Sequence, residues 1–287
     1  MQGIRNYYEG SHDKSVIKSI YNSEHNLKAK YEVLEKYRLH NESFEEWVID
    51  RLELSGTEYV LDAGAGSGRF SVPIGRILKG NPGFLISCDL AEGVMLPSLD
   101  HARTESLPML HLAADAENLP FLSGQFDLVM ANHMLYHLPD LHRGLSEMKR
   151  VLKNTGRLLA TTNSEKGMPE LFDLHLKTMD RLGIPFGVKE EVITFSMENG
   201  AQILREQFEQ VDLWTYESGF RVKEAEPVFR YYAATQLYQG PVNDDNLSKE
   251  IRDAIAPCFV QLTEEMIRTR GGELVISKPV GAFVCTI

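Results

Sequence analysis

The chain has 287 residues, of which 43% are hydrophobic and 25% charged, a composition that excludes a largely disordered protein. Its formal net charge of −11 disfavours nucleic acid and anionic membranes as partners, because both require a positive surface. The three cysteines (Cys88, Cys258 and Cys285) do not form a disulfide framework, and no apolar stretch is long enough to span a membrane, so we expect a cytoplasmic protein.

The first 54 residues are expected to be mainly helical. Residues 29–54 place apolar side chains at helical spacing and predict one helix, which the pair Ser55-Gly56 ends. We therefore delimit residues 1–54 as an N-terminal helical cap segment.

Residues 55–163 alternate short apolar runs with helical segments. The runs predict strands at 59–61, 84–88, 109–113, 126–131 and 158–162. The helical segments lie at 67–79, 91–103 and 139–153. Such alternation is typical of an α/β fold, a doubly wound and mostly parallel sheet with helices on both faces.

The pattern is looser in residues 164–287. Helices are predicted at 169–183, 197–207, 223–240 and 246–270, with strands at 208–216 and a final strand or hairpin within 273–286. Pro257 should kink or break the last helix, because it cannot donate a backbone hydrogen bond. We expect this part to complete the sheet and to add helical insertions that cover a substrate site.

A glycine-rich turn follows the first predicted strand, in the sequence VLDAGAGSGRF at 60–70. Glycine permits positive φ angles and a close approach of the backbone to a ligand, and ligands of parallel sheets bind beyond the carboxyl ends of the strands. Arg69 stands where the dinucleotide fingerprint requires its third glycine, counted from Gly64. Asp62 also disfavours a pyrophosphate in this turn. The turn therefore predicts a small-molecule site of another kind.

Two further carboxylates end the next two strands. Asp89 can accept hydrogen bonds from ribose hydroxyls, and Asp115 can accept one from the exocyclic amine of adenine. Together with the glycine turn, they indicate a ligand that has an adenosine and a cationic tail and lacks phosphates.

The sequence resembles the class I S-adenosylmethionine-dependent methyltransferases, especially the ubiquinone/menaquinone-type small-molecule subgroup. The resemblance covers about residues 30–163 and is carried by VLDAGAGSGRF (60–70), ISCDL (86–90), AADAENLPF (113–121), FDLVMANHMLYHLPD (126–140) and MKRVLKNTGRLLATT (148–162). It implies a Rossmann-like seven-stranded sheet, S-adenosylmethionine as cofactor with S-adenosylhomocysteine as product, and methyl transfer to a small molecule. About 50 residues (221–270) stand where the family has a short turn, which suggests an elaborated substrate cap.

The resemblance implies roles in the cofactor site. Asp62 is expected near the amino group of the methionine part, and Ala63, Gly64 and Gly66 beneath that part. Arg69 is expected either to reach the cofactor carboxylate or to face solvent.

The nucleoside part is expected on the next two strands. The resemblance implies that Asp89 binds the ribose and that Leu90 lies beside the adenine. Asp115 and Ala116 resemble the adenine-binding pair of the family.

The segment after the fourth strand carries the candidate catalytic residues. Asn132 and His137 match residues that face the methionine part. His133 and His137 are the candidate general bases, because imidazole titrates near neutral pH. Alternatively, both only shape the cavity, since alignment of the nucleophile alone supplies much of the rate. The histidine pair with Asp140 is too weak a pattern for a metal site, and no metal is expected.

Several tyrosines are candidates for the substrate pocket. Tyr7, Tyr8 and Tyr21 are expected to fold over the cofactor, because aromatic faces attract a sulfonium as they do other cations. Tyr136 and Tyr232 are expected to line the pocket, with packing as the alternative for each.

Three functions therefore remain open. The first is methyl transfer to an unidentified small molecule, at an oxygen, nitrogen, carbon or sulfur. The second is a non-catalytic regulatory protein that binds S-adenosylmethionine, and the third is an NAD-dependent oxidoreductase, which Arg69 opposes. No nucleic-acid or membrane partner is expected, and the sequence leaves the oligomeric state open.

Overall fold

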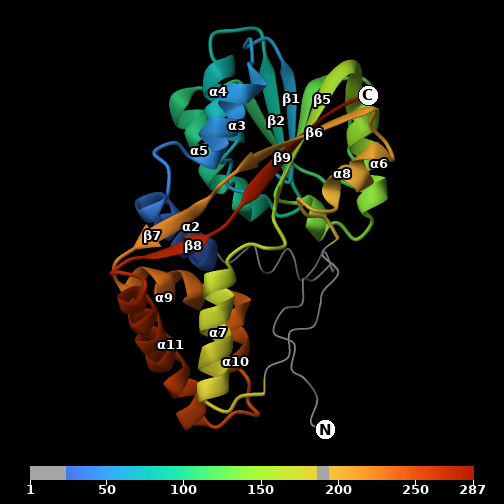
Figure 1. Ribbon diagram of the computed structural model, residues 1–287. Helices are drawn as coiled ribbons and strands as arrows, with labels where there is room; N and C mark the ends of the chain where they lie inside the picture. The colour runs from blue at the N-terminus through green and yellow to red at the C-terminus, as the bar shows by residue number, and fades with distance from the viewer. Residues whose placement is uncertain (1–23, 186–193) are drawn as a thin grey trace.

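The computed structural model describes residues 24–185 and 194–287. Figure 1 shows two parts, a twisted sheet flanked by helices and a separate group of helices. Segments far apart in sequence contribute to each part, so the chain passes between the two parts more than once (Figure 1).

The central sheet has seven strands in the order β3-β2-β1-β4-β5-β9-β6. They are β1 (Tyr59–Ala63), β2 (Phe84–Asp89), β3 (Met109–Ala113), β4 (Phe126–Asn132), β5 (Leu152–Asn163), β6 (Gln210–Tyr216) and β9 (Val280–Thr286). Strands β1 to β5 pair in parallel, and β9 runs antiparallel to both β5 and β6. The predicted α/β fold with a mostly parallel seven-stranded sheet is confirmed.

Helices cover both faces of this sheet, as its apolar strands require. On one face lie α3 (Phe44–Leu52), α4 (Ser71–Leu78) and α5 (Leu96–Glu105), the last preceded by the 3₁₀ helix η1 (Glu92–Met95). On the other lie α6 (Leu141–Val151) and α8 (Gly200–Arg205). Leu61 and Val129 are fully buried against α6 and α8, and Val60 and Leu128 are buried against α3 and α4.

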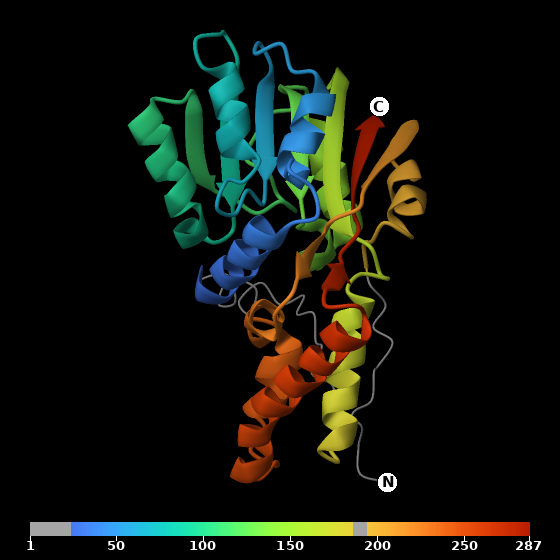
Figure 2. The ribbon, with the colours of Figure 1, turned by 60° about the vertical axis from the view of Figure 1, so that its left-hand side comes forward.

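The second part, which we call the cap, is a helical layer with a two-stranded sheet. It comprises α2 (Glu24–Tyr37), α7 (Pro169–Arg181), α9 (Ala225–Ala233), α10 (Gln236–Val242), α11 (Lys249–Thr269), β7 (Gly219–Val222) and β8 (Leu274–Ser277). The cap has its own core, which includes Leu174, Phe220 and Phe259. Figure 2 shows it beyond the ends toward which the parallel strands run, with α2 between the two parts.

The predicted helix over residues 29–54 is wrong, because two helices occupy this range. Helix α2 ends at Tyr37, and α3 begins after Ser43. The Ser43 side chain accepts a hydrogen bond from the backbone of Glu46, whose carboxylate accepts one from the Ser43 backbone. This reciprocal capping starts a new helix where apolar spacing alone suggested continuation.

Residues 223–240 are helical as predicted, divided into α9 and α10. Pro257 does not break the last helix, since α11 runs from Lys249 to Thr269 with this proline inside. Pro257 is exposed, while Cys258 and Phe259 beside it are buried in the cap, so packing offsets the lost hydrogen bond. None of the helices in the described ranges is both long and apolar enough for a membrane crossing.

The last segment is neither one strand nor a hairpin. β8 pairs with β7 in the cap, and β9 enters the central sheet between β5 and β6. The short link Lys278-Pro279 between β8 and β9 therefore carries the chain from the cap to the sheet.

Candidate functional site

The glycine turn after β1 adopts the backbone conformation that its sequence predicts. Gly64, Gly66 and Gly68 have φ angles of 72°, 54° and 85°. A Cβ atom at Gly64 would lie 2.8 Å from Cγ of Met134, and one at Gly68 would lie 2.5 Å from Cβ of Ser98. A Cβ at Gly66 would have no heavy atom within 4 Å. Gly64 and Gly68 thus serve packing, whereas Gly66 borders open space that can admit a ligand.

Asp89 connects the end of β2 to this turn. Its Oδ2 accepts a hydrogen bond of 3.0 Å from the Gly66 backbone, and its Oδ1 accepts one of 3.0 Å from Ala91. Burial raises the pKa of Asp89 above its usual range, while the backbone donors oppose that shift. Each oxygen retains lone-pair capacity for a further donor such as a ribose hydroxyl. Leu90, next along the chain, is half-buried beside it.

Asp62 lies beneath the turn rather than in open space. It is 1% exposed, and its carboxylate accepts hydrogen bonds from Oγ of Ser71 at 2.5 Å and from Nδ2 of Asn132 at 3.3 Å. Burial raises the pKa of Asp62 to about 6. Ala63, which follows it, is fully buried.

Asn132 at the end of β4 offers an unused acceptor. While its Nδ2 donates to Asp62, its Oδ1 is buried and accepts no hydrogen bond from the residues described. A buried polar atom without a partner is costly, so a donor from a ligand would stabilise this site. The ammonium of a methionine group supplies such a donor.

Asp115 and Ala116 extend the same edge beyond β3. Oδ1 of Asp115 accepts a hydrogen bond of 3.0 Å from the Glu117 backbone, and Ala116 is buried. Because β2 and β3 pair in parallel with Asp89 opposite Ala113, the two acidic residues end neighbouring strands. One edge of the sheet thus carries the glycine turn, Asp89, Asp115 and Asn132. This edge is rich in hydrogen-bond acceptors and has open space at Gly66, which fits an adenosine with a cationic tail.

Arg69 is bound by two carboxylates, and its side chain is 29% exposed. Its Nε donates to Glu45 at 2.5 Å, and its Nη1 donates to Glu35 at 3.1 Å. The guanidinium also lies 4.1 Å from the ring centroid of Tyr31 on α2. These contacts of Arg69 therefore connect α2 and α3 to the segment that precedes α4. The two carboxylates compensate the charge of Arg69.

His133 is held in an unusual backbone conformation after β4. Its φ is 52°, and its backbone N–H donates to the Thr161 carbonyl at 3.0 Å. Burial, assisted by the charges of Lys278 and Arg69, lowers the pKa of His133 to about 3. The ring is therefore neutral at physiological pH and too weakly basic to favour the predicted role as general base.

His137 and Tyr136 lie together in the 3₁₀ helix η2 (Leu135–His137). Their rings meet edge to face with centroids 4.5 Å apart, and both side chains are half-buried. Within the ranges that the structure describes, no group of three or more His, Cys, Asp or Glu side chains is arranged to hold a metal ion.

The prediction that Tyr232 lines the substrate pocket is wrong. Tyr232 is fully buried in the cap, where its ring stacks on Phe259 with centroids 3.9 Å apart. Its hydroxyl is 2.7 Å from Nδ1 of His175, and burial raises its pKa. Helical spacing on α9 turns it toward α7 and α11, so it is a core residue. Tyr7, Tyr8 and Tyr21 lie outside the described residues.

Sequence reasoning missed Lys278, which the structure brings to the carboxyl edge of the sheet. Its Nζ donates a hydrogen bond of 2.7 Å to Oδ1 of Asn163, the last residue of β5. The dipeptide Lys278-Pro279 has the composition of an ordinary turn. No spacing motif relates it to Asn163, so the sequence contains no signal that would have identified it.

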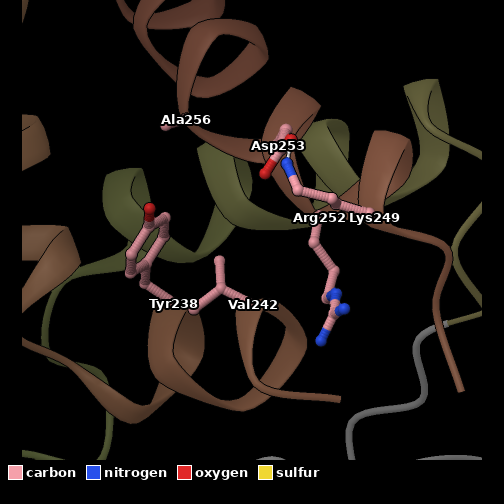
Figure 3. A pocket seen from close by; sticks show the side chains of 6 residues that line it. All are labelled: Tyr238, Val242, Lys249, Arg252, Asp253 and Ala256. Atoms are coloured by element: carbon pink, nitrogen blue, oxygen red, sulfur yellow. Dashed lines mark hydrogen bonds and ion pairs between the residues drawn. The ribbon is translucent and has the colours of Figure 1, made fainter. Parts of the chain in front are cut away.

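Two surface cavities lie away from this edge. One of about 560 Å³ is lined by residues of α10 and α11, including Tyr238 and Arg252 (Figure 3). These helices lie in the part of the cap away from the sheet (Figure 1). Another of about 500 Å³ lies at the amino ends of the strands, beside Tyr59 and Phe84. Neither includes a residue of the glycine turn, and parallel sheets bind their ligands at the opposite edge.

Comparison with known proteins agrees with the geometry. Residues 61–160 match a family described as a methyltransferase domain. The ubiquinone/menaquinone biosynthesis C-methyltransferase of Haemophilus ducreyi is 30% identical over 140 residues, covering 47% of this chain and 53% of the relative. The malonyl-(acyl-carrier protein) O-methyltransferase of Salmonella typhimurium is 28% identical over 193 residues, covering 67% and 71%. The chain thus spans about half the length of the first of these relatives.

A solved structure of the (4+2)-cyclase SpnF has the same fold, with a TM-score of 0.53 at 15% identity over 95% of this chain and 96% of that one. A likeness at this identity shows the fold and not the reaction. The family match and the site together define residues 61–160 as a class I S-adenosylmethionine-dependent methyltransferase domain, as the sequence motifs predicted. The cofactor of this class is S-adenosylmethionine.

Proposed function

We propose that this chain transfers the methyl group of S-adenosylmethionine to a small-molecule acceptor held between the sheet and the cap. The observation that supports it most is the buried, unpartnered Oδ1 of Asn132 beside a glycine turn that is open at Gly66. When bound, the cofactor supplies a methyl group on a sulfonium, which an aligned nucleophile displaces in line.

The cofactor-binding roles follow from the hydrogen bonds that remain to be made. Asn132 accepts from the ammonium group, and Asp62 acts behind it by orienting its amide through the bond to Nδ2. Asp89 accepts from the ribose hydroxyls. Asp115 and Ala116 contact the adenine, as the resemblance implies.

Catalysis is proposed to rest on alignment rather than on a strong base. Because the pKa of His133 is about 3, this residue stays neutral and does not remove a proton at neutral pH. Positioning the nucleophile can alone supply ~7–11 kcal/mol of the barrier. His133, His137 and Tyr136 then shape the space in which the acceptor approaches.

The acceptor is proposed to be a small molecule covered by the cap. One relative is named a C-methyltransferase of ubiquinone/menaquinone biosynthesis, and the other a malonyl-(acyl-carrier protein) O-methyltransferase. These names favour a small acceptor that contains a ring or an acyl group. The net charge of −11 disfavours nucleic acid. Residues 164–287 supply the cap helices α7 and α9 to α11, and residues 1–54 supply α2.

A direct test is transfer of a labelled methyl group from S-adenosylmethionine across a library of small phenols, quinols, amines, thiols and carboxylic acids. We expect label in at least one acceptor, with S-adenosylhomocysteine formed in equal amount. If the protein binds the cofactor but transfers no label to any acceptor, it is a binding protein rather than an enzyme.

A further inference from the structure

Lys278 lies where the cap joins the sheet, the region in which the acceptor is proposed to bind. It lies in the link between β8 of the cap and β9 of the sheet, and its Nζ is bonded to Asn163 at the carboxyl end of β5. The backbone of Ser164 also donates to the Pro279 carbonyl at 3.1 Å, which fixes the link against the end of β5. The Lys278 charge acts on His133, which follows the neighbouring strand β4.

The charged groups around Lys278 do not balance. Lys30 from α2, Arg69 before α4 and Glu45 from α3 act on its ammonium. Glu45 and Glu35 already bind Arg69, at 2.5 and 3.1 Å. Across the part of the chain that the structure describes, neither Lys278 nor Lys30 has a carboxylate within ion-pair distance. Among the described residues, three cations (Lys278, Lys30 and Arg69) therefore face two carboxylates (Glu35 and Glu45).

Both lysines are half-buried. Burial lowers the pKa of Lys278 to about 8 and also lowers the pKa of Lys30. A half-buried ammonium that has no ion-pair partner among the described residues loses part of its hydration without compensation, and such groups are ordinarily paired. In a chain with a net charge of −11, an uncompensated positive charge at the acceptor edge is a specific feature. A ligand that carries one negative charge would compensate it.

We propose that the Lys278 amine binds a carboxylate of the methyl acceptor, which makes the substrate a small carboxylic acid. The amine has two N–H donors left after its bond to Asn163, enough to hold one carboxylate. The excess of one positive charge matches a monoanion better than a phosphate dianion. This inference rests on the proposed function, because it assigns the substrate class of the same site.

The test compares carboxylic acids with their neutral amides as probes. Benzoate, hexanoate, phenylacetate and 4-hydroxybenzoate, their amides, and inorganic phosphate are titrated by ligand-observed NMR into the full chain with saturating S-adenosylhomocysteine. We expect at least one acid to bind ten-fold or more tightly than its amide. Lys278→Met should abolish that preference, and Lys278→Arg should retain it. Lys223→Met, which removes an exposed cap lysine, should leave it unchanged.

Equal binding of every acid and its amide, or a preference that survives in Lys278→Met, would overturn the proposal. Tighter binding of phosphate than of every acid would also overturn it. S-adenosylhomocysteine binding is measured in the same samples, so failure of the proposed function is seen separately. Removal of an unpaired cation should leave the thermal midpoint of Lys278→Met equal to or above that of the parent.

Discussion

The carboxylate of Asp89 accepts the backbone hydrogen of Gly66 across 3.0 Å, so the end of β2 fixes the turn that follows β1. These residues stand 23 positions apart and meet because their strands are parallel neighbours. The other carboxylate oxygen is bonded to Ala91. One side chain thus orders the turn and offers its remaining lone pairs to a ligand.

Substitution of Asp89 is expected to weaken cofactor binding. Asp89→Ala removes the proposed ribose acceptor and the hydrogen bond to Gly66, so the affinity for S-adenosylhomocysteine should fall by about 1–3 kcal/mol in titration calorimetry. Asp100→Ala, an exposed carboxylate on α5, is the matched control and should bind normally. An unchanged affinity in Asp89→Ala would show that the ribose binds elsewhere.

Gly66 and Gly124 form a matched pair that separates backbone strain from ligand access. Both have positive φ, 54° and 71°, and a Cβ would meet no atom within 4 Å at either. Each change to alanine should cost roughly 1–2 kcal/mol of unfolding free energy. Only Gly66→Ala should also lose S-adenosylhomocysteine affinity. Equal affinity in the two variants would argue against a ligand beside Gly66.

His133 should make the fold sensitive to acid. Its folded pKa of about 3 lies below the ordinary value of 6.5, so the unfolded chain takes up the proton first as the pH falls. The stability from its neutral ring is present above about pH 6.5 and is lost toward about pH 3.

The variant His133→Asn tests this sensitivity, because asparagine tolerates the φ of 52°. Between about pH 7 and pH 5, urea denaturation should show that the parent loses on the order of 1–2 kcal/mol more than the variant. A parallel loss in both proteins would mean that His133 is charged in the folded state.

Pro257 offers a simple gain in stability. It is exposed in the middle of α11 and leaves one carbonyl of the preceding turn without its helical donor. Pro257→Ala restores that donor and should raise the free energy of unfolding by about 1–3 kcal/mol. An unchanged or lower thermal midpoint would indicate that the carbonyl already has another partner.

The sheet and the cofactor residues were predictable from sequence because their signals are local. The apolar runs of β1 to β5 end in the residues that form the site, such as Asp89 and Asn132. Parallel pairing then brings those ends to one edge without further information. Arg69 was less predictable, since its partners Glu35 and Glu45 lie in helices that sequence spacing had merged.

The cap was less predictable because its signals are long-range. β7 has four residues and is stabilised by pairing with β8, more than fifty residues later, so its own short sequence gave no strand prediction. The sequence around Tyr232 in α9 does not reveal that its ring packs on Phe259 of α11. The position of Lys278 depends on the return of the chain from cap to sheet, which no local pattern encodes.

The most direct test of cofactor binding at the glycine turn is parallel calorimetric titration of the unaltered protein with S-adenosylhomocysteine and with NADH. We expect saturable binding of S-adenosylhomocysteine at one site per chain and no heat from NADH beyond dilution. Binding of NADH alone, or no binding of S-adenosylhomocysteine at saturating concentration, would contradict this expectation.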